Sequence, residues 1–208
     1  MELYEAIEKR RTVRDFLDKT VPDDVLKRIL AAGLKAPTHD HARNWHFVVL
    51  RDPARIADVL KAVAGKTAEQ VEIVRNWKEA TVCQRAMYGD ALPKQTRMLM
   101  QSRCLVIPLF KAGEELMHPQ GVTTLNPFAS IWCVIENILL AATAEGLGVA
   151  LRIPLGTDEE EAYVLNRLGV PSGYKMPCYL AFGYPAPSAP VLRQTACPLE
   201  ERLHAERW

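Results

Sequence analysis

Two short segments near the start of the chain concentrate side chains that can bind a charged ligand. Residues 10–14 read Arg-Arg-Thr-Val-Arg, so three guanidinium groups lie within five residues. Guanidinium groups this close repel one another unless an anion lies among them, and arginine is well suited to bidentate phosphate binding. The hydroxyl of Thr12 adds a further donor. The segment predicts a phosphate site, with a solvated basic turn as the alternative.

The second segment, residues 35–50, joins the end of an expected helix to a short apolar strand. It opens with Lys35, Pro37, Thr38 and His39 and continues with further histidine, arginine and amide groups before a tryptophan. Loops set on a rigid scaffold commonly carry binding residues. We therefore interpret the two segments as holding opposite ends of one flat, phosphate-bearing cofactor.

Other chemistries lack support from the residues. His39, His41 and His46 are of a type that binds metals, but no carboxylate pattern frames them, so no metal site is expected. No Ser-His-Asp order indicates a hydrolase. Glu136, within an apolar helix, is expected to cap a neighbour or to pair with an arginine, because a buried charge needs a partner.

The common nucleotide-binding motifs are also missing. The sequence Gly146-Leu147-Gly148 would need a glycine at position 151 to make a dinucleotide fingerprint, and Leu151 stands there. No phosphate loop ending in Gly-Lys-Ser/Thr is present. A bound nucleotide would therefore be anchored by arginine side chains.

The composition is that of an ordinary globular protein. The chain has 208 residues, 49% hydrophobic and 25% charged, which is enough for one sizeable domain. A formal net charge of +1 gives no reason to expect nucleic acid or an anionic membrane as a partner. The five cysteines follow no redox or zinc spacing, and no secretory signal opens the chain, so we expect a cytoplasmic protein with reduced thiols. Glu136 and Glu145 interrupt the most apolar helix, so no membrane span is expected.

Hydrophobic periodicity and turn residues predict the elements that position these groups. Helices are expected over residues 2–9, 22–33, 52–65, 67–88, a stretch after 93, 126–146, 157–169 and about 199–207. Strands are expected over residues 46–50, 104–110, 147–153 and 176–182. Residues 67–70 and 157–160 fit helix-capping sequences, and Pro108 indicates an edge strand or a bulge. Residues 111–126 show no clear period.

Four strands among seven or eight helices predict an α+β or α/β domain with a small sheet covered by helices. Beyond the last strand, three prolines between residues 185 and 190 keep the chain extended. Such an arm buries little apolar surface alone. We expect it to lie across a partner subunit.

Taken in order, these segments resemble the FMN-dependent nitroreductase family, and most closely its shorter members with an Ala-Pro-x-His loop. The resemblance rests on residues 10–14, 36–39, 45–48, 136–142, 146–148 and 180–185, the last reading Leu-Ala-Phe-Gly-Tyr-Pro. It implies an α+β fold with a small central sheet flanked by helices. It also implies a single domain over residues 1–208 and an intertwined homodimer with an FMN at each interface site. The extended C-terminal arm would cover about residues 185–208.

The resemblance also implies which residues bind FMN. Arg10, Arg11 and Thr12 would hold the phosphate, completed by Arg193 of the arm, with Arg14 near the flavin ring or ribityl chain. Lys35, Pro37, Thr38 and His39 would reach the flavin from the partner subunit. Leu151, Arg152 and Ile153 would present backbone N–H groups to the N5 and O4 edge of the flavin.

The implied activity is transfer of hydride from NAD(P)H through FMN to a small acceptor such as a nitroaromatic or quinone, by a ping-pong mechanism. Flavin N5 carries the hydride, so no catalytic side chain is required. A specialised dehalogenase or dehydrogenase and a non-catalytic flavin-binding protein are the alternatives on this fold, and a cofactor-free interaction domain is a third. Residues 41–45, His-Ala-Arg-Asn-Trp, replace the more frequent Asn-x-Gln-Pro-Trp, and Arg103-Cys104 and Arg152-Ile153 also depart from the family pattern. The acceptor is therefore left open.

Overall fold

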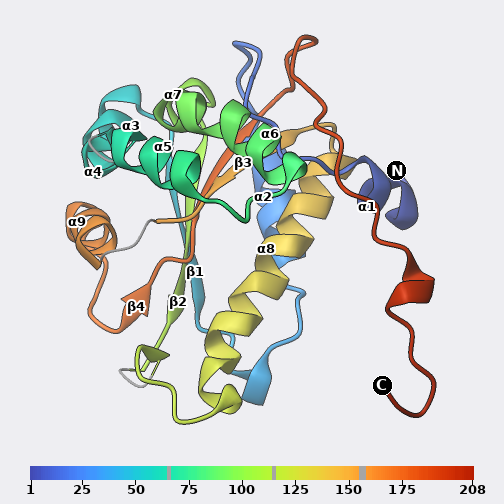
Figure 1. Ribbon diagram of the computed structural model, residues 1–208. Coiled ribbons are helices and arrows are strands. Elements are labelled where there is room, and N and C mark those ends of the chain that lie inside the picture. Colours follow the sequence, from blue (N-terminus) through green and yellow to red (C-terminus); the bar gives the residue numbers. More distant parts are fainter. Residues whose placement is uncertain (65–66, 114–115, 155–157) are drawn as a thin grey trace.

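The computed structural model describes residues 1–64, 67–113, 116–154 and 158–208, and within these ranges the side chains of residues 67–69 and 158 are not described. The chain forms an α+β fold in which helices cover both faces of a small sheet (Figure 1). The helices are α1 (Leu3–Lys9), α2 (Asp23–Gly33), α3 (Pro53–Val59), α4 (Lys61–Ala64), α5 (Thr67–Asn76), α6 (Val82–Ala91), α7 (Gln95–Gln101), α8 (Asn126–Ala144) and α9 (Asp158–Leu168). The strands are β1 (Trp45–Leu50), β2 (Leu105–Lys111), β3 (Gly148–Arg152), β4 (Tyr174–Lys175) and β5 (Tyr179–Gly183). Short 3-10 turns are η1 (His39–His41), η2 (Leu92–Lys94), η4 (Val122–Leu125) and η5 (Leu199–Glu201).

The strand order is β1-β2-β5-β3, with β4 paired to β2, and these pairings are antiparallel. The expectation that Pro108 marks an edge strand is wrong, because β2 lies between β1 and β5. On the side away from β1, β5 pairs with Leu105 and Val106 and β4 pairs with Phe110 and Lys111. Pro108 falls in the gap between these two pairings, where its missing N–H costs no ladder hydrogen bond.

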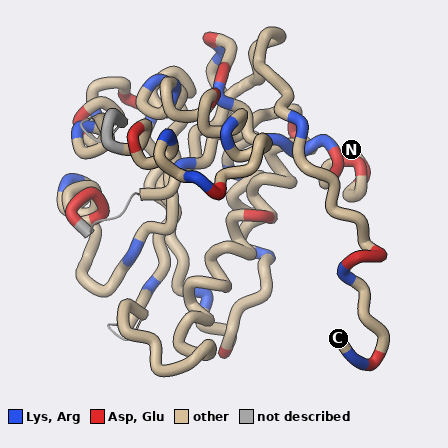
Figure 2. Tube along the Cα trace, in the orientation of Figure 1, with Lys and Arg blue, Asp and Glu red and all other residues tan. Residues whose placement is uncertain are grey.

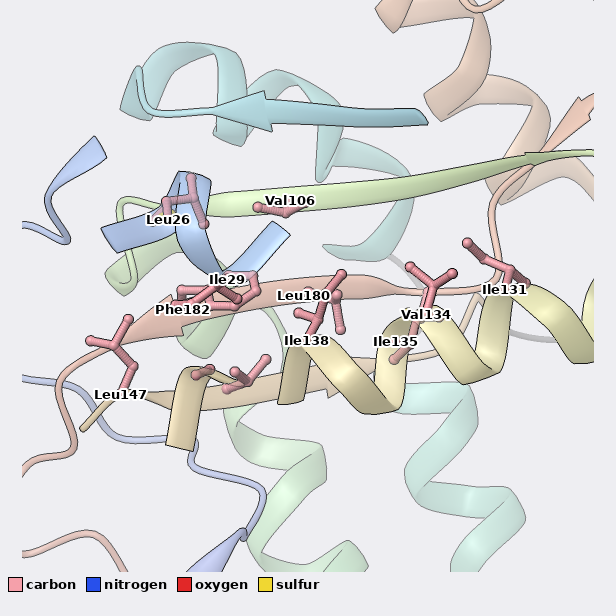
Figure 3. Close-up of a cluster of buried hydrophobic side chains, with 14 of the residues drawn as sticks. Leu26, Ile29, Val106, Ile131, Val134, Ile135, Ile138, Leu147, Leu180 and Phe182 are labelled. Atoms are coloured by element: carbon pink, nitrogen blue, oxygen red, sulfur yellow. The ribbon is translucent and has the colours of Figure 1, made fainter. Parts of the chain in front are cut away.

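One face of the sheet is covered by α8 and α2. Apolar residues of α8 recur every three or four positions and face the sheet residues Val106, Leu180 and Phe182 (Figure 3). The α8 residues of this stripe are Ile131, Val134, Ile135 and Ile138. Leu26 and Ile29 of α2 complete this core. Trp45, the first residue of β1, is also buried here.

The other face is covered by α3, α4, α7 and α9. Strand side chains alternate between faces, so Tyr179 and Ala181 of β5 point to this second core while Leu180 and Phe182 point to the first. Both faces are apolar, which explains why the central strands read as continuous hydrophobic runs.

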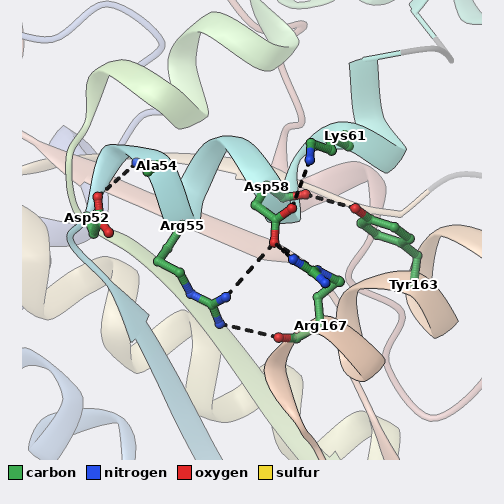
Figure 4. Close-up of polar contacts among 7 residues, drawn as sticks. All are labelled: Asp52, Ala54, Arg55, Asp58, Lys61, Tyr163 and Arg167. Atoms are coloured by element: carbon green, nitrogen blue, oxygen red, sulfur yellow. Dashed lines mark hydrogen bonds and ion pairs between the residues drawn. The ribbon is translucent and has the colours of Figure 1, made fainter.

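On this second face of the sheet, ion pairs connect α3 and α9 (Figure 4). Asp58 accepts hydrogen bonds from Nε of Arg167 at 2.8 Å and from Nζ of Lys61 at 3.0 Å, and the Arg167 bond holds the pKa of Asp58 below its usual value. The hydroxyl of Tyr163 donates to the backbone carbonyl of Asp58 at 3.2 Å. Asp52 accepts from the N–H of residue 54 at 2.9 Å and begins α3, as Asp-Pro at this point predicts.

The segment Val122–Ala144, which includes α8, is long and apolar enough to cross a membrane by length and composition alone, with a mean hydropathy of 1.5. Its apolar stripe packs on the sheet, and 39% of its most apolar window is buried inside the protein. We interpret α8 as the core helix of the domain.

Three expected helices differ from the structure. The helix over 67–88 is split into α5 and α6, because Thr81 and Gln84 form a capping box that starts a new helix, with bonds of 3.2 and 2.7 Å. The helix over 52–65 breaks at Leu60. The helix over 199–207 is wrong, since only the short turn η5 forms. The expected caps at Thr67 and Thr157 lie outside the described side chains.

Candidate functional site

Residues 10–14, here named the arginine segment, pack against the edge of the sheet at β3. The N–H of Val13 donates to the carbonyl of Val149 at 3.1 Å. Thr12 also pairs with Val149 in an isolated parallel β-bridge. A Cβ added to Gly148 would stand 2.5 Å from the Cβ of Val13, and one on Gly183 would stand 2.7 Å from the ring of Phe16. Such contacts are too short for any side chain, so these two glycines let residues 12–16 pack directly on β3 and β5.

A cavity of about 410 Å³, here named the arginine cavity, opens between this segment, α6 and the C-terminal arm. Four of the predicted cofactor residues line it: Arg11, Thr12, Arg14 and Arg193. The remaining lining residues are Cys83, Gln84, Met87, Pro190, Leu192, Gln194 and Thr195. None of the described lining residues is acidic, so the cavity is strongly cationic. Sequence reasoning missed the α6 residues, although Cys83, Gln84 and Met87 share one face of that helix.

Arg14 is the most buried of these cations. Its side chain is 10% exposed, and Nη1 lies 3.3 Å from Oδ2 of Asp90 on α6. Its Nε is buried and has no hydrogen-bond partner among the described residues. Burial lowers the pKa of Arg14, and the neighbouring Asp90 opposes this effect. A buried donor without a partner is costly, so an acceptor group from a ligand would stabilise this arrangement.

The other two arginines of the segment are arranged differently. Arg10 turns toward α8, where its Nε lies 3.6 Å from Oε1 of Glu136, and it does not line the arginine cavity. The expectation that Glu136 pairs with an arginine is confirmed. Arg11 is exposed, and its Nη1 donates to the carbonyls of Glu8 at 2.5 Å and of Arg10 at 2.7 Å.

β3 contacts the arginine segment at Gly148 and Val149, the first two residues of the strand. Because Val149 turns its carbonyl toward Val13, the alternation of the strand turns the N–H group of Leu151 toward the same side, away from β5. Ile153 is 50% exposed. The edge of β3 that points away from β5 therefore lies on the side of the arginine segment.

The side chain of Arg152 points into the core. It forms a bidentate ion pair with Glu160 of α9, with Nη2 to Oε2 at 3.0 Å, and its Nε donates to Oε1 of Gln95 at 2.8 Å. The hydroxyl of Tyr179 donates to Oε1 of Glu160 at 2.8 Å, and burial raises the pKa of Tyr179. Arg152 can therefore contribute to a ligand only through its backbone.

The second predicted segment lines another cavity, of about 90 Å³, here named the loop pocket. Its lining residues are Thr38, His39, Ala42, Arg43, Asn44, Trp45, Phe110, Lys111, Pro127 and Ser130. The N–H of His39 donates to Oγ of Ser130 at 3.3 Å, while Nδ1 of His39 is buried without a partner in the described part of the chain. Lys35 and Pro37 are exposed just before it.

The loop over residues 40–43 is strained. Asp40, His41 and Arg43 have φ values of 48°, 50° and 43°, in the left-handed region that side chains other than glycine rarely adopt. His46, the third histidine of the segment, bonds instead to the hydroxyl of Tyr174 at 3.1 Å. Among the described residues no group of three His, Cys, Asp or Glu is placed to hold a metal ion.

Within one chain, the two predicted segments do not meet at a single cavity. Each touches α8: Arg10 approaches Glu136, and His39 bonds Ser130. These α8 residues are six positions apart (136 − 130), which is about 9 Å along a helix axis. The residues around the arginine cavity and those around the loop pocket are therefore separate sets.

A family model described as the nitroreductase family matches residues 7–184, which includes both predicted segments and every strand. The chain belongs to the nitroreductase family.

Named relatives of this nitroreductase-family chain fall into two groups. It is 29% identical to an iodotyrosine deiodinase of Nematostella vectensis over 202 residues, covering 96% of this chain and 73% of that protein. It is 27% identical to an NADH dehydrogenase of Thermus thermophilus over 186 residues, covering 86% and 84%. Among solved structures, a nitroreductase with bound FMN from Bacteroides fragilis matches with a TM-score of 0.67 and 28% identity over 95% of each chain.

Proposed function

We propose that this protein is a cytoplasmic, FMN-dependent oxidoreductase that passes electrons from NAD(P)H to a small acceptor. The observation that carries the proposal is the arginine cavity, where Arg11, Thr12, Arg14 and Arg193 surround about 410 Å³ and no described lining residue is acidic. The buried, unpartnered Nε of Arg14 supports an acceptor-rich ligand at this place. Arginine binds phosphate with two parallel hydrogen bonds, which suits a phosphate-tailed cofactor.

The residues present fit FMN. Arg11, Thr12 and Arg193 would hold the phosphate, with Arg10 close by at its ion pair with Glu136. Arg14 and the backbone N–H groups of Leu151 and Ile153 would meet the ring. Bound FMN would supply the transfer of hydride from NAD(P)H and of electrons to the acceptor. A fixed guanidinium at Arg14 would stabilise negative charge on the reduced ring, since preorganised charges are often the largest catalytic effect.

We further propose that the protein works as a homodimer in which Lys35, Pro37, Thr38 and His39 reach the cofactor held by the partner. Leu3, Tyr4 and Ile7 share a face of α1 and are 61%, 82% and 48% exposed. Val191, Leu203 and Trp208 of the arm are also exposed, at 78%, 70% and 99%. Apolar groups gathered on α1 and along an extended arm suit a surface that a second copy covers. The chain would then act as one domain over residues 1–208.

The visible spectrum of the purified protein, before and after anaerobic addition of NADPH or NADH, tests this function. We expect the absorbance of an oxidised flavin and its loss on reduction, followed by recovery on adding a quinone or a nitroaromatic. A colourless protein that takes up no FMN would refute the proposal. Bound FMN that neither reductant bleaches would favour a binding protein without turnover.

A dehalogenase is the second candidate, because an iodotyrosine deiodinase is among the relatives that match nearly the whole chain. The two candidates differ in the acceptor. Release of iodide from 3-iodotyrosine by the reduced protein, with no reduction of quinones or nitroaromatics, would select the dehalogenase.

A further inference from the structure

Two cationic side chains, those of Arg43 and Lys111, line the loop pocket. The N–H of Lys111 donates to the carbonyl of Asn44 at 3.0 Å, and Trp45 pairs with Phe110 across β1 and β2. These contacts bring Arg43 and Lys111 to adjoining strand ends at the mouth of the pocket. Neither side chain forms an ion pair with a residue in the described ranges. Among the residues that Figure 2 draws in blue or red, the end of the molecule where β1 and β2 approach the start of α8 carries more basic than acidic positions.

Further donors converge on the same pocket. Pro127 and Ser130 line it from the beginning of α8, a helix of 19 residues that follows η4 directly. The positive end of a helix dipole favours an anion. Nδ1 of His39 is buried and unpartnered within the described structure. Within the described ranges, His39 has one acidic neighbour at ion-pair distance: its Nε2 lies 3.6 Å from Oδ2 of Asp40, whose side chain is 89% exposed and does not line the pocket.

The size of the pocket limits what can enter. Its volume of about 90 Å³ is room for a few water molecules. A carboxylate or a group of similar size would fit, whereas an aromatic ring with its substituents would not. The body of a larger ligand would have to lie outside, past Thr38 and His39.

We propose that the loop pocket binds the anionic group of an aromatic acceptor whose ring lies against the flavin of the partner subunit. The proposal rests on the proposed function, because it needs Thr38 and His39 at the partner's flavin. The two positive charges of Arg43 and Lys111 would bind the anion, and Ser130 and the start of α8 would line the inner side of the site. The preferred acceptors of this enzyme would therefore carry a carboxylate or an equivalent acidic group.

Steady-state kinetics with two acceptors of matched shape test the proposal. 4-Nitrobenzoate carries the carboxylate and 4-nitrobenzamide is its neutral counterpart. Each is measured with the wild-type holoenzyme and with Arg43→Gln, Lys111→Gln and the control Lys27→Gln, an exposed α2 lysine away from both cavities. We expect kcat/KM for 4-nitrobenzoate to fall about tenfold in each pocket variant, through KM, because a charge-assisted hydrogen bond is lost. The amide should stay within about twofold, and the control should match wild type for both acceptors.

Other outcomes overturn the proposal. Equal losses for both acceptors would show that the two cations hold the loop and not an anion. Unchanged kinetics for both would show that the pocket is not used. Repeating the assay with NADH and NADPH gives a third result: a loss confined to NADPH would assign the cations to the extra phosphate of the reductant.

The same variants separate this inference from the proposed function. A wild-type protein that binds FMN but reduces neither acceptor would refute the activity and leave the pocket to a binding measurement. Isothermal titration of the holoprotein with 4-nitrobenzoate should then show binding that Arg43→Gln weakens about tenfold and Lys27→Gln does not. Binding that is absent, or equal in all variants, would refute the pocket.

Discussion

Two arginines that the sequence assigns to the flavin site have opposite environments. The guanidinium of Arg152 forms an ion pair with Glu160, and its Nε donates to Gln95, so its side chain belongs to the core. Arg14 has Asp90 for part of its charge and leaves a buried Nε unsatisfied beside a cavity. Residue type alone could not separate these roles, because the partners come from α6, α7 and α9. Of the two, Arg14 is the arginine whose side chain lines a cavity.

The buried pair of Arg152 and Glu160 gives a prediction at this scale. Glu160→Gln keeps the side-chain volume but leaves the Arg152 guanidinium buried without its counter-charge. We expect the free energy of unfolding to fall by about 3 kcal/mol, and the melting temperature by roughly 6–12 °C for a chain of this length.

Thermal and urea unfolding of the variant measure this loss, and Glu159→Gln on the exposed side of the same helix is the control. The control should stay within about 0.5 kcal/mol of wild type. The double variant Arg152→Met/Glu160→Leu should be more stable than Glu160→Gln alone, because no buried charge remains. If Glu160→Gln unfolds like the control, the pair has no structural role.

At the scale of elements, the glycines of the sequence explain how the arginine segment is held. The sequence places Gly148 in a Gly-Leu-Gly motif but gives no reason for it once a dinucleotide fingerprint is excluded. The structure supplies the reason, since Val13 occupies the space of the missing side chain. The segment 12–14 and the start of β3 are therefore positioned by one close contact.

Gly148→Ala should displace the arginine segment from β3. We expect the dissociation constant for FMN to rise about tenfold or more, equal to about 1.4 kcal/mol, because Thr12 and Arg14 shift together. Gly89→Ala is the control, since a Cβ there meets nothing within 4 Å and lies inside α6. That variant should keep its affinity and gain slightly in stability, as alanine is the better helix former. Fluorescence titration with FMN measures the affinity of both variants. Normal affinity in Gly148→Ala would contradict the proposed packing of the arginine segment on β3.

Most helices and strands follow from the sequence, and the exceptions have local causes. The core face of α8 is readable because its apolar residues repeat every three or four positions. The break before α6 was missed because the capping pair Thr81 and Gln84 lies in the middle of a polar stretch. The contribution of α6 to the arginine cavity could not be read from the chain at all, since Cys83 and Arg11 are brought together only by the tertiary fold.

At the scale of the whole molecule, a single chain does not bring the predicted cofactor residues together at one cavity. Arg11, Thr12, Arg14 and Arg193 surround one cavity, whereas Thr38 and His39 line another. The extended arm and the outer face of α1 expose apolar side chains in the isolated chain. We infer that each flavin site is composite, with the arginine cavity from one subunit and the segment 35–39 from its partner.

Native mass spectrometry of mixed dimers tests this composite site most directly. Two differently tagged chains are coexpressed, one with Arg11→Ala and Arg14→Ala and the other with Thr38→Ala and His39→Ala. Each variant homodimer has both sites damaged, and we expect little FMN on either. In the mixed dimer one site carries all the damage and the other is intact, so the account predicts one FMN per dimer. A mixed dimer with no FMN would place both segments at the same site within one chain, and FMN held by a monomer would contradict the composite site altogether.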